Sequence, residues 1–246
     1  MKQLLLSGLL AAALAAQADD RSQVNERPQA NKERPEANKE RLWILTGEAY
    51  KDNYYFGGGL LIPFPRSHLG QGWVQRYWLD TFTYSYEAGT QQIDSSVWGA
   101  EAMLGYQASR PGLSGALYLG VRYSDAHLSP DDPGSALRGQ QWFPKAQVEG
   151  EAMLSQTWRA NAIAAYTFLL DGYWTRFRLL RGLTGTKFLG PELVVQGDPN
   201  YSALKLGAVF GGIPLSSRVS LNVKGGYRWQ SGADSPYIGA ELVGQF

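Results

Sequence analysis

Apolar and polar residues alternate along most of the chain, in runs separated by clusters of Gly, Pro, Asp, Asn and Ser. In 218–230, for example, Leu221 and Val223 alternate with Asn222 and Lys224. A period of two residues is typical of a β-strand whose two faces meet different environments. The pattern predicts twelve strands, at 42–51, 54–63, 73–88, 93–108, 113–125, 141–155, 157–170, 172–183, 187–196, 201–212, 218–230 and 237–246.

The length of these strands and the rings near their ends favour a membrane barrel over a soluble sandwich. A tilted strand needs about 9–11 residues to cross the hydrocarbon of a bilayer, whereas strands of globular proteins have about five or six. Rings such as Trp142, Trp158 and Trp229 stand near strand ends, where membrane interfaces select them. Because an open sheet edge is not tolerated in lipid, the first and last strands must pair. We therefore predict an all-β fold, a transmembrane antiparallel β-barrel of about twelve strands over 42–246.

Residues 1–41 differ in composition from the predicted strands that follow them. MKQLLLSGLLAAALAAQA combines Lys2, an apolar run and small residues at its end, which predicts a cleaved signal peptide over 1–18. An uncleaved anchor is the alternative, but the apolar run is shorter than a spanning helix needs. ERPQANK at 26–32 recurs as ERPEANK. Its prolines and balanced charge predict a disordered periplasmic tail over 19–41, with a partner-binding arm as the other interpretation.

Composition places the barrel in the bacterial outer membrane. The signal peptide predicts export, and the chain has no cysteine, so disulfides cannot stabilise it. The net charge of +1 gives no attraction to nucleic acid. We expect both termini on the periplasmic side, outer-membrane lipids around the barrel, and the longest outer loops at 63–72 and 124–140.

Charged residues fall mainly on the polar parity of the strands, so they are predicted to line the lumen. Both signs are present, with positive charge in excess. One interpretation is an ion-pair network that fills a wet lumen; the other is a constriction selecting polar or acidic saccharides. Arg176 and Arg178 are the strongest candidates for a basic stripe. The lumen-lining candidates are Arg76, Glu101, Arg122, Lys145, Glu149, Arg159, Arg176, Arg178, Lys205, Lys224, Arg228 and Glu241, with Asp80 and Glu151 on the same parity.

No catalytic, metal or cofactor site is predicted. Serine hydrolysis needs a histidine beside a serine, and the two histidines, His68 and His127, fall in the predicted outer loops. Asp125, Asp131 and Asp132 could bind calcium weakly, but SPDDPG is first of all typical of a turn. We therefore expect a protein that is not an enzyme; a lipid- or glycan-modifying barrel enzyme is the less favoured alternative.

Several segments resemble the BcsS-type cellulose biosynthesis proteins. They are YYFGGGLLIPFP, GWVQRYWLDTFTYSYEAG, WGAEAMLGYQAS, LYLGVRYSDAHLSPDDPG, VVQGDPNYSALKLGAVFGG and PYIGAELVGQF, and together they span most of 54–246. The resemblance implies an envelope component that serves cellulose export, and it brings no catalytic residues. YIGAELVGQF also resembles the carboxyl-terminal assembly signal of outer-membrane barrels, carried by Ile238, Leu242 and Phe246. That likeness implies recognition by the barrel-assembly machinery.

The sequence thus predicts an accessory component of cellulose or other exopolysaccharide biosynthesis and secretion, acting as a conduit or a scaffold. Its expected partners are cellulose or another polysaccharide and periplasmic secretion components. The alternative is a monomeric oligosaccharide-selective porin.

Overall fold

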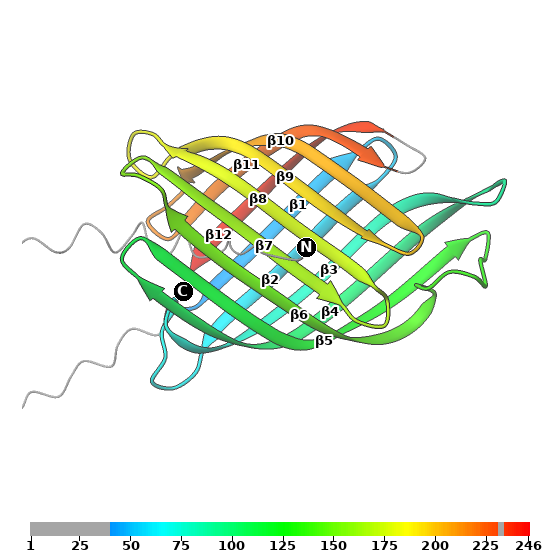
Figure 1. Cartoon of the computed structure of the whole chain (residues 1–246), viewed down its shortest axis with the longest axis horizontal. Coiled ribbons are helices and arrows are strands. Elements are labelled where there is room, and N and C mark those ends of the chain that lie inside the picture. Colours follow the sequence, from blue (N-terminus) through cyan, green and yellow to red (C-terminus); the bar gives the residue numbers. More distant parts are fainter. Residues whose placement is uncertain (1–39, 231–233) are drawn as a thin grey trace, which may run out of the picture.

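The computed structural model describes residues 40–230 and 234–246, and these residues form one closed antiparallel barrel (Figure 1). The signal peptide and nearly all of the tail predicted above lie outside the described residues. Among those that are described, no helix has both the length and the hydropathy to span a bilayer. The predicted fold, an all-β barrel of twelve strands, is confirmed. The strands are β1 (Leu42–Tyr50), β2 (Tyr54–Pro63), β3 (Gly72–Ala88), β4 (Gln91–Arg110), β5 (Leu113–Ser129), β6 (Gly139–Met153), β7 (Trp158–Thr167), β8 (Gly172–Gly182), β9 (Phe188–Asp198), β10 (Tyr201–Pro214), β11 (Val219–Gln230) and β12 (Ser235–Gln245).

Pairing of β1 with β12 closes the barrel. The register runs from Leu42 opposite Gln245 to Tyr50 opposite Tyr237. The main chain of Arg41 extends it, because its N–H donates to Phe246 O at 2.9 Å and its carbonyl accepts from Phe246 N at 3.0 Å. Every strand therefore has a partner on both sides, which satisfies backbone groups that lipid could not.

The outer surface is apolar. Neighbouring residues in a strand point to opposite sides, so Leu119 is 59% exposed while Tyr118 is 1% exposed. Outward positions on the other strands carry similar side chains, among them Leu79, Leu104 and Leu206. An apolar band of this kind around a closed barrel is what a bilayer requires.

Outward-facing aromatic rings gather at two levels of the barrel. Trp73 and Tyr106 lie with ring centroids 5.3 Å apart near the end that holds Arg41 and Phe246, which we call the terminus end. Toward the opposite end, the far end, Tyr123 lies 5.0 Å from Trp98 and 5.0 Å from Trp142. Rings at both edges of an apolar band are typical of the two membrane interfaces.

Four consecutive strands are longer than the rest. Strands β3 to β6 have 15–20 residues, whereas the other eight have 9–14. Their extra length projects beyond the far end on one side of the barrel, at the right of Figure 1. We call this projection the tall wall. It extends past Trp98 and therefore past the aromatic level.

The prediction of an outer loop at 63–72 was wrong. This connection follows β2, and in an antiparallel meander every second connection returns to the end where the chain started. It therefore lies at the terminus end, where His68 and Gln71 form an isolated bridge. The placement of His127 in a loop was also wrong, because His127 belongs to β5.

Candidate functional site: the lumen of the barrel

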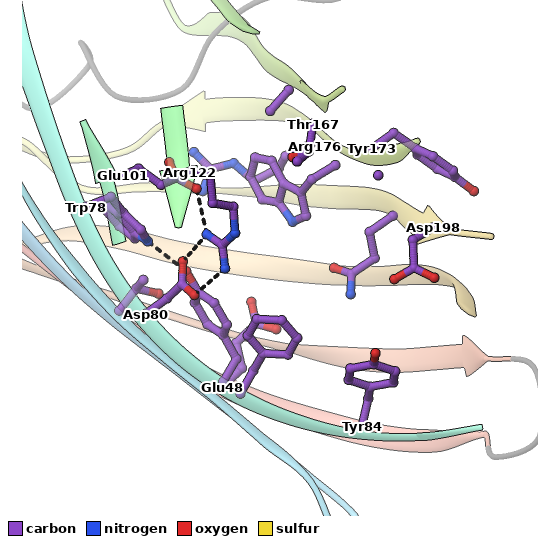
Figure 2. A pocket seen from close by; sticks show the side chains of 18 of the residues that line it. Glu48, Trp78, Asp80, Tyr84, Glu101, Arg122, Thr167, Tyr173, Arg176 and Asp198 are labelled. Atoms are coloured by element: carbon purple, nitrogen blue, oxygen red, sulfur yellow. Dashed lines mark hydrogen bonds and ion pairs between the residues drawn. The ribbon is translucent and has the colours of Figure 1, made fainter. Parts of the chain in front are cut away.

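The barrel interior holds a cavity of about 290 Å³. Charged side chains form its base, and aromatic rings lie above them toward the far end. Figure 2 shows Arg122 at the base between Glu101 and Asp80, with Tyr84 and Asp198 farther along the lumen. Alternation places these groups inside, because each occupies an inward position of its strand.

One ion-pair group at the base is centred on Glu101, which is 5% exposed. Its carboxylate accepts from Arg76 Nη1 at 3.0 Å, from Arg122 Nη1 at 2.7 Å and from Lys145 Nζ. Arg122 also forms a two-point pair with Asp80, both contacts at 2.7 Å. We call Arg76, Asp80, Glu101, Arg122 and Lys145 the Glu101 cluster. Bidentate charged pairs fix geometry, so this wall of the lumen is held in one arrangement.

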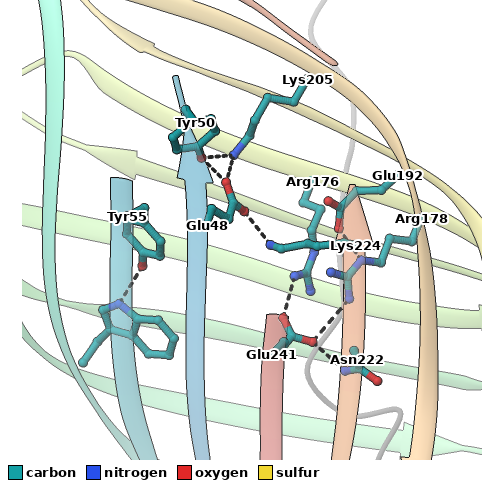
Figure 3. Close-up of polar contacts among 11 residues, drawn as sticks. Glu48, Tyr50, Tyr55, Arg176, Arg178, Glu192, Lys205, Asn222, Lys224 and Glu241 are labelled. Atoms are coloured by element: carbon teal, nitrogen blue, oxygen red, sulfur yellow. Dashed lines mark hydrogen bonds and ion pairs between the residues drawn. The ribbon is translucent and has the colours of Figure 1, made fainter. Parts of the chain in front are cut away.

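A second ion-pair group occupies the opposite side of the base (Figure 3). Glu48 accepts from Lys205 Nζ at 2.6 Å, from Lys224 Nζ at 2.5 Å and from the Tyr50 hydroxyl. Lys205 Nζ lies 3.1 Å from Tyr50 Oη as well. The Glu48 carboxylate thus forms ion pairs with two ammonium groups.

The same group continues to Glu241 of β12. Its carboxylate accepts from Arg176 Nη1 at 3.3 Å, Arg178 Nη1 at 3.5 Å and Asn222 Nδ2 at 2.8 Å. Arg178 Nε donates to Glu192 at 2.6 Å. Strands β8 and β12 are four positions apart around the barrel, so the arginine pairs of Glu241 span the lumen. The Glu48–Glu241 cluster comprises Glu48, Arg176, Arg178, Glu192, Lys205, Lys224 and Glu241.

Apolar side chains form a cluster at the terminus end of the lumen, beside buried polar side chains such as Gln107, Ser114 and Glu151. Val74, which is fully buried, belongs to this cluster, whose members come from six strands. Leu69, from the connection between β2 and β3, packs against them from the end of the barrel. The cavity lining includes Ile44 of this group, and the other members of the group lie outside that lining. The members of this apolar plug are Leu42, Ile44, Leu61, Val74, Met103, Ala116, Tyr118 and Val243.

At the far end, the tall wall reaches over toward β9–β11. Tyr84 lies against Tyr201 with ring centroids 5.3 Å apart. Gln230 Nε2 donates to the carbonyl of Ser85 at 2.9 Å. Asn200 Nδ2 lies 3.0 Å from Ser135 Oγ, which joins the β9–β10 turn to the β5–β6 loop. Residues at the strand ends of this level, such as Tyr54 and Asp198, also line the cavity, so the cavity extends to the far end.

The structure places the side chains proposed from the sequence inside the barrel. Ten are at most 8% exposed, and Lys145 and Arg159 are half-buried. Nine belong to the two clusters; the other three are Glu149, Arg159 and Arg228. Glu149 accepts a hydrogen bond from Gln147, while Arg159 lies over the Phe188 ring. Ile238, Leu242 and Phe246, proposed as an assembly signal, share the outward face of the last strand, where Ile238 is 69% exposed.

Sequence reasoning missed two carboxylates and most of the aromatic lining. Glu48 has the same parity as Leu42, Ile44 and Thr46, and the first two of these residues made that face look apolar. Glu192 stands in β9, where both parities carry apolar residues, so alternation could not assign a face. Pairing with a neighbouring strand could have assigned Glu192, because Glu192 lies opposite Arg178 in the β8–β9 register.

The residues considered for catalysis and metal binding belong to neither cluster and do not line the cavity. The side chain of His127 is 82% exposed, and His68 lies exposed at the terminus end. Asp131 accepts from Arg138 at 2.8 and 2.6 Å. Asp132 accepts from Gly134 N at 2.9 Å and from Tyr86 at 2.8 Å. The SPDDPG segment thus forms a hydrogen-bonded loop, as the turn interpretation expected.

The family described as cellulose biosynthesis protein BcsS matches residues 46–246. No curated protein matches the chain. Among solved structures, the KdgM porin is similar at 11% identity and a TM-score of 0.47, with 83% of this chain and 99% of that chain covered. Outer membrane phospholipase A from Escherichia coli is similar at 13% identity and a TM-score of 0.44, with 84% and 96% covered.

Proposed function

Since the chain belongs to the family of BcsS cellulose biosynthesis proteins, we propose that it is an accessory component of cellulose biosynthesis in the bacterial outer membrane and acts there as a scaffold. The apolar band and the two levels of aromatic rings support a barrel surrounded by lipid. The proposal includes cleavage of residues 1–18 on export and a periplasmic location for 19–41.

One observation carries the choice of scaffold over conduit. A conduit needs a continuous wet path, whereas the apolar plug and the pairs from Glu241 to Arg176 and Arg178 occupy the lumen. Opening a path would require unpacking the plug and separating charges that are buried with their partners. Breaking such pairs costs several kcal/mol each, about 3–5 when one partner is removed.

In this scaffold, the periplasmic face offers contacts to secretion components and the far end faces the cell exterior. Ile238, Leu242 and Phe246 lie outward at the closing seam, which fits contact with barrel-assembly machinery or lipid. The cavity, open toward the far end, supports contact with a glycan on the cell surface.

The porin alternative has its own supporting observation, a lumen lined by charged groups of both signs. Conductance in planar bilayers separates the two functions. The scaffold predicts no steady current through the purified protein, and a current that oligosaccharides block would favour the porin.

The cellular test is a deletion of the gene, complemented with the wild-type chain. We expect cellulose output or its attachment to the cell surface to fall on deletion and to return on complementation. Unchanged cellulose in the deletion strain would overturn the proposed role.

A further inference from the structure

Arg228 of β11 is a buried cation without a carboxylate partner. It is 3% exposed and lines the cavity. Its Nε and Nη2 atoms have no hydrogen-bond partner among the described residues, and it forms no ion pair with any of them. Its contact is with the face of the Tyr50 ring, whose centroid lies 4.0 Å from the guanidinium carbon.

A guanidinium in this state is an unusual feature of a protein interior. Buried charges are normally paired, and buried donors normally have acceptors. The ring of Tyr50 stabilises the charge through its π face but offers no acceptor to the N–H groups at Nε and Nη2 of Arg228. The coplanar N–H groups of a guanidinium can donate two parallel hydrogen bonds to one carboxylate.

The surroundings of Arg228 also favour an anion. Lys205 stands opposite Arg228 in the β10–β11 register, and the carboxylate nearest to Lys205 is Glu48, which Lys224 shares. Glu192 and Glu241, the other carboxylates of this group, pair with Arg176 and Arg178. The group together with Arg228 therefore has five cations and three carboxylates, which leaves positive charge in excess.

Aromatic rings beside Arg228 offer a second kind of contact. Tyr50, Tyr84 and Tyr201 line the cavity, and Tyr84 packs on Tyr201. The flat faces of such rings suit the C–H face of a sugar ring, and their hydroxyl groups suit its oxygens. Tyr84 Oη is buried without a hydrogen-bond partner among the described residues. The volume, about 290 Å³, fits one or two sugar rings rather than a long chain, since pockets for larger ligands reach about 1,000 Å³.

We propose that the cavity binds an acidic saccharide unit, with its carboxylate on Arg228 and its sugar ring against the tyrosines. This inference rests on the proposed function, because a scaffold for cellulose meets glycans at the far end. It adds a preference for a carboxylated sugar over the neutral glucan.

The test is a binding titration of the purified barrel in detergent, followed by the fluorescence of Trp78 and Trp174, which line the cavity. The probes are cellobiouronic acid, cellobiose and acetate. Hydrogen bonds to a charged group favour the acidic disaccharide by at least about tenfold. Equal affinity for cellobiose and cellobiouronic acid would overturn the proposal, and so would acetate binding as tightly as the disaccharide.

Variants assign the site. Arg228→Gln is expected to remove the preference for the acidic disaccharide, and Arg228→Lys to retain part of it. Arg218→Gln is the matched control, because Arg218 is exposed in the β10–β11 turn outside the cavity. Heat-modifiable migration on gels verifies that each variant is a folded barrel. An Arg228→Gln barrel that is folded and keeps the full preference would refute the assignment.

Failure of this inference is distinguishable from failure of the proposed function. The titration reports on the cavity alone, whereas cellulose output in the deletion strain reports on the role in the cell. A barrel that binds no acidic sugar but whose deletion lowers cellulose output would refute only the inference.

Discussion

The rings of Tyr84 and Tyr201 meet with centroids 5.3 Å apart and planes at 52°, although β3 and β10 are five positions apart around the barrel. The tall wall makes this possible, because β3 continues past the aromatic level and brings Tyr84 above the lumen. The contact spans the lumen at the far end of the cavity, which both rings line.

Replacing Tyr84 by alanine should widen the far end of the cavity. Because the chain has no cysteine, Thr167→Cys provides a single thiol in the cavity lining. We expect maleimide to label this thiol several-fold faster in the Tyr84→Ala background. Tyr77→Ala is the control, since Tyr77 is 42% exposed on the outer surface. Equal labelling rates in the two backgrounds would show that the ring pair does not limit access.

Replacing Glu241 by glutamine should destabilise the barrel. The change leaves Arg176 and Arg178 buried with less negative charge, which costs about 3 kcal/mol of unfolding free energy. Urea titration of the protein folded into lipid vesicles measures this loss. Glu87→Gln removes an exposed carboxylate at the far end, so it should change stability by less than about 0.5 kcal/mol. A similar small effect of both substitutions would contradict a stabilising role for the cross-lumen pairs.

Replacing Phe246 by alanine should lower the yield of assembled barrel in cells several-fold, while the purified variant refolds. The reason is that Phe246 lies at the seam, 51% exposed, with its main chain paired to Arg41. Phe56→Ala removes a ring of similar exposure, 54%, on β2. Equal membrane yields of the two variants would argue against a special role of the last residue in assembly.

The loop between β5 and β6 should respond to acid. Hydrogen bonds from Arg138 hold the pKa of Asp131 below its ordinary value of 3.8. A lowered pKa means that the pair stabilises the loop above the ordinary value and that this contribution is lost as the pH falls through the lowered one. Amide-exchange protection at Arg138 N, which donates to Gln141, should therefore hold from neutral pH to about pH 4 and decrease below it. An Asp131→Asn chain that shows the same acid-dependent loss would contradict this origin.

Alternation was sufficient to assign the inward face of most strands. Lys224 and Arg228 alternate with Val223 and Tyr227 in a strand with one polar and one apolar face, so a period of two decided their direction. Glu192 could not be assigned, because its strand is apolar on both parities. Inward aromatic residues such as Tyr84 were missed for a related reason, since a ring suits a membrane interface as well as a cavity wall.

Features that depend on the whole barrel were beyond local patterns. The end of the barrel at which 64–71 lies follows from counting strands, and the local alternation of residues around His68 does not encode it. The pair between Arg176 and Glu241 joins residues that are 65 positions apart in the chain. Such a contact depends on barrel diameter and strand tilt, which no short segment encodes.

The ion pairs between β8 and β12 have a mechanical consequence. Backbone hydrogen bonds hold each strand only to its neighbours, so they permit a cylinder to flatten under the lateral pressure of packed lipids. Side chains that join non-neighbouring strands act as internal braces against that deformation. The barrel should therefore keep its cross-section when bilayer thickness or tension varies.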